Sequence, residues 1–282
     1  YYIRYHNKTP AVGFDGFGVP TIPGFVDATN APWAYFAQYA DDVNLIGASF
    51  ATQVMGAAVS GEISYRWNDP VPINGLVGSL ILPPDFGPSA GGTTTRRSGF
   101  VREKRLQFIL NYLASFARGT RLIGPVVGWI GANDISFVAE WGLVYYPGLD
   151  ESCLLVGFFG PTDESASTIQ TGCTAYAGPA GTAVSVDEVS FGYQLRVGPT
   201  YFNPFGLPIR LLPSVSWQHD IDGVTPGLNP YIGERKGVNI GVEVIYLDTW
   251  TFRANYANFF GAGAANNIND RDFLSFSLSY AF

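Results

Sequence analysis

Apolar and polar residues alternate one by one along many stretches of this chain, and this alternation restricts the fold more than any other feature. In the stretch 59–67, Ile63 and Tyr65 stand at odd positions, while Glu62 and Arg66 stand at even ones. Successive side chains of a β-strand point to opposite faces of a sheet. Each such stretch therefore predicts a strand with one apolar and one polar face, and the chain as a whole predicts an all-β fold.

The pattern recurs often enough to predict roughly ten strands, each about as long as the 9–11 residues that a tilted strand needs to cross a bilayer. The predicted strands are 1–5, 43–55, 59–67, 106–116, 135–145, 191–197, 209–220, 238–246, 250–260 and 274–282. Pro213 lies inside one of them. Because proline cannot donate to a hydrogen-bond ladder, it predicts a local bulge or a weakened ladder there.

The charged residues of these strands share the polar face. We predict that eight of them line a polar lumen: Glu62, Arg66, Arg105, Glu140, Arg196, Arg210, Glu243 and Arg253. The exception is His219, which falls on the apolar face near a strand end. A soluble β-sandwich would pack its apolar faces into a core of Val, Ile and Leu, whereas here Phe, Tyr and Trp are frequent near strand ends, as in the girdles of membrane barrels. The sequence favours a transmembrane antiparallel β-barrel over a sandwich.

The connections between the predicted strands alternate in length. Longer ones, rich in Gly, Pro and Asp, fall at 6–41, 68–103, 147–186, 221–234 and 261–270, shorter ones fall at 56–58, 198–208 and 247–249, and one of intermediate length falls at 117–133. Outer-membrane barrels have long loops on one side and short turns on the other. The chain would then end on the short-turn, periplasmic side, and the long loops could fold inward as a constriction or plug.

Composition excludes several other classes. Charged residues make up 14% of the 282-residue chain, against about 25% in soluble domains. The mean hydropathy is only +0.12, and no apolar run reaches the roughly 20 residues of a spanning helix. The net charge of −7 supplies no basic face for nucleic acid. The content of aromatic and β-branched residues excludes a disordered chain.

Residues with distinctive chemistry are few. Cys153 and Cys173 lie in one turn-rich segment, and we expect a loop disulfide, which would imply an oxidising compartment. With neither a CxxC motif nor metal-ligand spacing, we expect no metal and no cofactor. Without a G-x-S-x-G motif we expect no catalytic residue and no enzyme, although a barrel-embedded lipid hydrolase using His219 remains an alternative.

Other polar clusters have plainer interpretations. Arg96, Arg97 and the segment 102–105 form a basic cluster on the long-loop side, which could hold phosphates of lipopolysaccharide or simply pair with neighbouring acids. The acidic pairs 41–42, 220/222 and 270/272 could bind Ca²⁺, which takes six to eight oxygen ligands. We expect them instead to be solvated loop acids.

The last stretch, 273–282, alternates strictly and ends on a phenylalanine. We interpret Tyr280 and Phe282 as an assembly signal for the bacterial outer-membrane assembly machinery. The alternative is a soluble protein that simply ends in a strand.

Eight motifs resemble the C-terminal half of the DUF1302 family of large Gram-negative outer-membrane proteins. They occur in family order at 2–10, 61–66, 69–74, 102–104, 213–220, 234–237, 256–261 and 270–273. The resemblance implies a single barrel domain over 1–282 in the outer membrane, forming the C-terminal portion of a larger barrel. A signal peptide and further strands are expected to precede it. It also implies export or uptake of hydrophobic or amphipathic compounds, with a periplasmic or inner-membrane transporter as partner.

We therefore expect an outer-membrane channel or transporter that passes solutes through a charge-lined lumen, surrounded by membrane lipids and lipopolysaccharide. Two alternatives remain at this point. One is a structural or scaffold barrel whose loops bind a partner protein, and the other is the lipid hydrolase.

Overall fold

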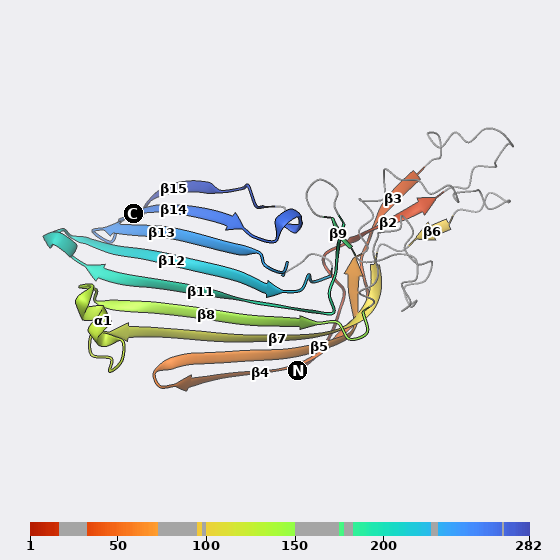
Figure 1. Cartoon of the computed structure of the whole chain (residues 1–282), viewed down its shortest axis with the longest axis horizontal. Coiled ribbons are helices and arrows are strands. Elements are labelled where there is room, and N and C mark those ends of the chain that lie inside the picture. The colour runs from red at the N-terminus through yellow and green to blue at the C-terminus, as the bar shows by residue number, and fades with distance from the viewer. Residues whose placement is uncertain are drawn as a thin grey trace.

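The main body of the protein is one ten-stranded antiparallel sheet, which Figure 1 shows lengthwise. The computed structural model describes residues 1–16, 33–72, 95–97, 100–149, 175–177, 183–226, 231–266 and 268–282. The strands of the sheet, in order, are β1 (Tyr2–Tyr5), β4 (Val43–Val54), β5 (Ala57–Pro72), β7 (Phe100–Ala117), β8 (Asp134–Tyr145), β11 (Val189–Phe202), β12 (Ile209–Asp222), β13 (Lys236–Tyr246), β14 (Trp250–Phe260) and β15 (Phe273–Tyr280). Each strand pairs with the next in this order, so the sheet is a meander.

All ten predicted strands are present, and three extend well beyond their predicted ends. β5 has 16 residues, β7 has 18 and β11 has 14. The alternation in the sequence breaks near Trp67, where the prediction stopped. A register shift between Arg66 and Asp69 accounts for this break, since beyond it Asp69 pairs with Glu103 and the two strands continue together. A bulge of this kind keeps a ladder going while it moves later side chains to the other parity.

The connections predicted as loops contain small elements that the alternation did not reveal. β2 (Ala11–Gly16), β3 (Trp33–Gln38) and β6 (Thr95–Arg97) form a three-stranded sheet, and β9 (Ala175–Ala177) and β10 (Ala183–Ser185) form a two-stranded one. The helical elements are α1 (Gly124–Trp129), η3 (Pro204–Gly206) and η4 (Gly263–Ala265). These strands have three to six residues each and lie within long connections rich in Gly and Pro, where so short an alternation does not stand out.

Within the part of the chain that the structure describes, no helix combines the length and the apolar character that a membrane crossing requires.

Pro213 weakens one ladder without shifting its register. On one side, β12 pairs with β13 continuously across Pro213 and Val242. On the other side, the β11–β12 pairs stop at Val197 with Val215 and resume in the same register at Tyr201 with Leu211. The weakened ladder expected at this proline is therefore present, while the bulge in β12 lies elsewhere, beside Asp220.

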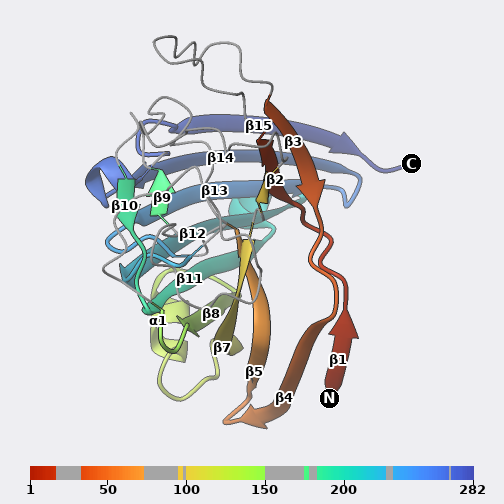
Figure 2. The same ribbon diagram turned by 90° about the vertical axis from the view of Figure 1, so that its right-hand side faces the viewer.

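The sheet curves into an open trough, seen from its end in Figure 2. β1 and β15 lie at the two edges and do not pair with each other, so the ten strands do not close into a barrel by themselves. β1 covers only the first part of β4, ending with the bonds between Tyr1 and Gly47. Among the described residues, 48–54 of β4 have a strand partner on the β5 side only.

A small hydrophobic core lies at the long-loop end of the trough. It joins strand residues to the connecting segments, and we call it the loop-end core: Val71, Val101, Val144, Tyr146, Leu149, Val186, Val224 and Ile232. Val101 and Val144 have the same strand parity as Arg105 and Glu140, so this core sits on the polar side of the sheet. It fixes the long connections to that end of the trough.

Replacing Val144 by Ala should lower the free energy of unfolding by about 1–2 kcal/mol, because two buried methyl groups are removed and a small cavity is left. Val144 is 2% exposed, whereas Val126 in α1 is 49% exposed. The same change at Val126 is the matched control and should change stability little. Urea unfolding of the protein in lipid vesicles measures both, and equal losses would contradict the placement of the core.

Candidate functional site

The pairing registers place all eight predicted lumen residues on one face of the sheet. Residues directly opposite each other on paired strands lie on the same face. Arg66 is opposite Arg105, and Glu243 is opposite Arg253. Glu140 pairs with Asn111 on one side and with Gln194 on the other. Following the registers from β5 to β14 brings Glu62, Arg196 and Arg210 onto this polar face as well.

The opposite face carries large apolar side chains that the described part of the chain leaves exposed. Those at least one third exposed include Ile46, Phe50, Ile63, Leu110, Val197, Val215, Ile240, Phe252, Tyr256, Leu274, Phe276, Leu278 and Tyr280. Soluble monomers seldom expose contiguous apolar patches larger than a few hundred Å². This face therefore needs an apolar neighbour.

A concavity of about 440 Å³ lies on the polar face, and we call it the trough groove. Residues of seven strands, from β7 to β15, line it: Asn111, Val138, Glu140, Gln194, Leu195, Arg196, Ser216, Trp217, Gln218, Gly237, Val238, Asn239, Ala257, Phe259 and Phe273. A single hollow lined by side chains of seven neighbouring strands requires the sheet to curve toward that face. The polar face is thus the inner, concave face of the trough.

A cluster around Asp69 lies at the long-loop end of the polar face. The Asp69 carboxylate lies 3.7 Å from Arg66 Nε and 3.5 Å from Arg105 Nη1, and it accepts a hydrogen bond of 3.0 Å from the Tyr146 hydroxyl. Both arginines also donate to Gln107 Oε1, at 3.4 Å and 3.0 Å. Two guanidinium groups thus share one carboxylate, and the cluster carries a net positive charge. The Asp69 cluster comprises these five residues.

The burial of Tyr146 raises the pKa of its hydroxyl well above the ordinary value of a tyrosine, and the neighbouring Asp69 carboxylate adds to the rise. Tyr146 directly follows β8 and belongs to the loop-end core as well as to the Asp69 cluster. It therefore connects the packing of the long loops to the charged inner face.

The other predicted lumen residues have local partners rather than partners across the trough. Arg253 donates to the Glu243 carboxylate beside it. Arg210 lies 3.5 Å from Asp248, in the turn after β13. Glu140 accepts a hydrogen bond of 3.0 Å from Gln194.

Two further lumen residues have only uncharged partners. The Tyr1 hydroxyl reaches Glu62. Arg196 reaches only the Ser214 hydroxyl, at 3.5 Å, and within the described ranges no carboxylate lies at ion-pair distance from it.

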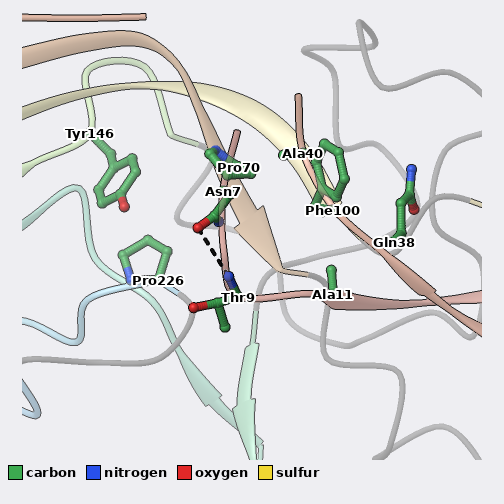
Figure 3. A pocket seen from close by; sticks show the side chains of 9 residues that line it. All are labelled: Asn7, Thr9, Ala11, Gln38, Ala40, Pro70, Phe100, Tyr146 and Pro226. Carbon is green, nitrogen blue, oxygen red and sulfur yellow. Dashed lines mark hydrogen bonds between the residues drawn. The ribbon is translucent and has the colours of Figure 1, made fainter. Parts of the chain in front are cut away.

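A second, smaller cavity of about 150 Å³ lies among the long connections (Figure 3). Tyr146 and Pro226 lie on one side of it, and Phe100 and Ala40 lie on the other. Pockets that hold a drug-sized ligand are about 300–1,000 Å³. This cavity is too small for such a molecule, so we treat it as part of the narrow loop end rather than as a binding site.

A comparison with known protein families matches the whole chain, residues 1–282, to the family described as "Protein of unknown function (DUF1302)". The chain belongs to the DUF1302 family. The resemblance drawn from its motifs is thereby confirmed, and the family description itself assigns no activity. A search of curated proteins found no match.

His219 of this DUF1302 chain has aromatic surroundings on the apolar face. Its ring lies edge-on to Tyr193 and Trp217, with centroid distances of 5.7 Å and 6.3 Å, and it pairs across the strands with Lys236. Lys236 is a second basic residue on the apolar parity that the sequence analysis had not noted. Both stand at the long-loop ends of their strands, where a cation can reach a polar layer.

The acidic and basic loop clusters have partners within the DUF1302 chain. Arg102 forms an ion pair of 2.9 Å with Asp41. The Asp220 carboxylate is buried against Arg235 at 2.6 Å, and Asp272 accepts hydrogen bonds from Tyr256 and Asn258. No group of three metal-ligating residues occurs in the described ranges.

Two other predictions concern the two cysteines and the C-terminal end of the chain. Cys153 and Cys173, which we expected to form a disulfide, lie outside the described residues. Tyr280 and Phe282 stack at 6.3 Å at the exposed end of the chain.

Asp69 is the inner-face residue that the sequence analysis missed. The alternation had ended before it, and the bulge restores its side chain to the polar face.

Replacing Asp69 by Asn should lower the free energy of unfolding by about 2 kcal/mol, because two largely buried guanidinium groups lose their shared carboxylate. The control is Asp248→Asn, since that side chain is 88% exposed and its ion pair should contribute under about 1 kcal/mol. Urea unfolding should separate the two variants, and equal effects would contradict the role of Asp69.

Stability should fall at high pH partly through Tyr146. Because the folded state holds this proton more tightly than the unfolded chain, the contribution is complete below the ordinary tyrosine pKa of about 10 and is lost progressively as the pH rises above it. The wild-type protein should thus lose stability more steeply above about pH 10 than Tyr146→Phe does. Urea unfolding across this range measures the two slopes, and parallel slopes would contradict the prediction.

Proposed function

We propose that this chain forms part of the wall of a transmembrane β-barrel in the outer membrane of a Gram-negative bacterium, and that the barrel passes solutes through a polar lumen. The observation that carries the proposal is the sorting of side chains by face. Eight charged strand residues lie on the concave face, and the convex face exposes large apolar side chains. Lipid on one side and water on the other match this division.

Aromatic rings at both ends of the strands support a membrane position. Trp250 and Tyr280 pack together at the short-turn end, with ring centroids 4.7 Å apart. Tyr2 and Trp67 stack at 6.1 Å nearer the long-loop end. Amphipathic rings prefer the two interfaces of a bilayer, where they form girdles around outer-membrane barrels.

The open edges of the sheet support a larger barrel. In lipid, each unpaired backbone group costs several kcal/mol, and both β15 and most of β4 present such edges within the described residues. We propose that additional strands pair with these edges and close the wall. The exposed end at Tyr280 and Phe282 would then serve as the assembly signal for insertion.

The polar face supports passage rather than a purely structural role. The trough groove is lined by carboxamides, one hydroxyl and two charged side chains beside apolar ones, and these polar groups can replace part of the hydration of a passing solute. The Asp69 cluster and the loop-end core lie on the same face at the long-loop end, and we propose that they narrow the path there. We propose amphipathic compounds as the solutes and a periplasmic or inner-membrane transporter as the partner.

Planar-bilayer recordings of the protein purified from outer membranes test the proposal. Discrete conductance steps are expected. Arg253→Gln should shift the reversal potential toward cation selectivity, because it leaves the Glu243 carboxylate unpaired in the lumen. Arg121→Gln, which removes the same charge from an exposed turn, is the matched control and should behave as wild type.

Heat-modifiable migration on gels verifies that each sample is folded. A folded sample without conductance steps would contradict passage and favour the scaffold alternative. Steps that Arg253→Gln leaves unchanged would contradict the placement of this residue in the lumen.

A further inference from the structure

Two straight cross-strand rows of side chains make up most of the trough groove. One row runs through Arg196, Ser216, Asn239, Ala257 and Phe273, each directly paired with the next. The adjacent row runs through Asn111, Glu140, Gln194, Gln218, Gly237 and Phe259. The groove is therefore ordered across the sheet, with charges on β8 and β11 and aromatic rings on β14 and β15.

Between these two ends the rows contain carboxamides and Ser216, followed by two small residues beside the rings. Gly237 and Ala257 are paired directly with Phe259 and Phe273, and both small residues are buried. The ring of Phe259 lies over Gly237, since a Cβ added there would be 3.3 Å from the ring. The absence of a side chain at Gly237 thus lets the Phe259 ring lie close to the sheet, where it forms part of the apolar end of the groove.

Arg196 is the cationic residue of the groove lining, and within the described ranges no carboxylate lies at ion-pair distance from it. Its only hydrogen bond among the described residues is the 3.5 Å contact with Ser214, which leaves most of its five N–H donors available. Glu140, one row away, has its carboxylate engaged by Gln194 at 3.0 Å. The other arginines of the inner face have carboxylate partners: Arg66 and Arg105 with Asp69, Arg210 with Asp248, Arg235 with Asp220, and Arg253 with Glu243.

We infer that the trough groove is a binding site for an amphipathic solute with a carboxylate group, which Arg196 binds while the apolar part of the solute lies against Phe259 and Phe273. A guanidinium group with free donors is suited to a planar carboxylate. The amides along the rows offer hydrogen bonds to further polar groups. The inference rests on the proposed function, because it names the class of solute that passes through the same lumen.

The strand spacing sets the size of the solute. Phe259 and Phe273 stand three and four strands from Arg196, and neighbouring strands are about 4.8 Å apart, so the rings lie at most about 14–19 Å from the guanidinium along the sheet. A fatty acid of ten carbons approaches the lower of these distances. Much shorter acids would leave the rings uncovered.

Equilibrium binding of radiolabelled decanoate and decanol to the protein in lipid nanodiscs tests the inference. The wild-type protein should bind decanoate more tightly than decanol. Arg196→Gln should weaken decanoate binding roughly five- to tenfold, as expected for the loss of a charge-assisted hydrogen bond in a wet site, and should leave decanol unchanged. Glu140→Gln should tighten decanoate binding, because it removes a neighbouring negative charge. Phe259→Ala should weaken both ligands.

Arg121→Gln is the matched control, because it removes the same charge outside the groove. Equal binding of decanoate and decanol by the wild type, or an unchanged preference in both Arg196→Gln and Glu140→Gln, would overturn the inference. A general loss of folding would weaken decanoate binding in both variants. The weaker binding expected for Arg196→Gln and the tighter binding expected for Glu140→Gln therefore distinguish an effect on the site from misfolding. If the protein binds decanoate selectively but shows no conductance steps, the proposed passage of solutes is contradicted and the binding site is not. If it shows conductance steps but no preference for decanoate, the binding site is contradicted and the passage of solutes is not.

Discussion

The alternation of side chains between the two faces of a single antiparallel meander is the constraint on which the rest of this structure depends. Because consecutive strands pair directly, the parity of a residue in one strand fixes its face relative to every other strand. One shifted residue would place arginines on the apolar face. The concave polar face, the exposed apolar face and the trough groove all follow from this register, which shifts only near the long-loop ends of β5 and β12 within the described residues.

The two faces have different internal organisation. On the apolar face, large side chains are exposed side by side, and their stabilisation depends on what surrounds the protein. On the polar face, most charges have partners on a neighbouring strand or turn, as Arg253 has in Glu243. Arg196, in the lining of the trough groove, departs from this rule, because its hydrogen-bond partner within the described ranges is only the Ser214 hydroxyl. A guanidinium group without a carboxylate partner in a groove is a candidate binding group for an anionic ligand.

Much of this arrangement could be predicted because it is local. The ten strands, the polar face and the weakened ladder at Pro213 follow from residue order and from the chemistry of single residues. Asp69 could not be placed this way, because a bulge changes its parity and only the pairing with Glu103 reveals it. The short strands β2, β3, β6, β9 and β10 and the helix α1 were also missed, since elements of so few residues do not stand out within the connections.

The sequence by itself determined the strand content, the two-faced character and the membership in the DUF1302 family, since these are encoded in the order of neighbouring residues. Only the tertiary structure decided which residues meet across strands. It aligned Arg196 with Phe273 through three small or polar residues, brought Asp69 between two arginines, and left the edges at β4 and β15 open. Such contacts join residues far apart in the chain, and they depend on register and curvature, which no local pattern specifies.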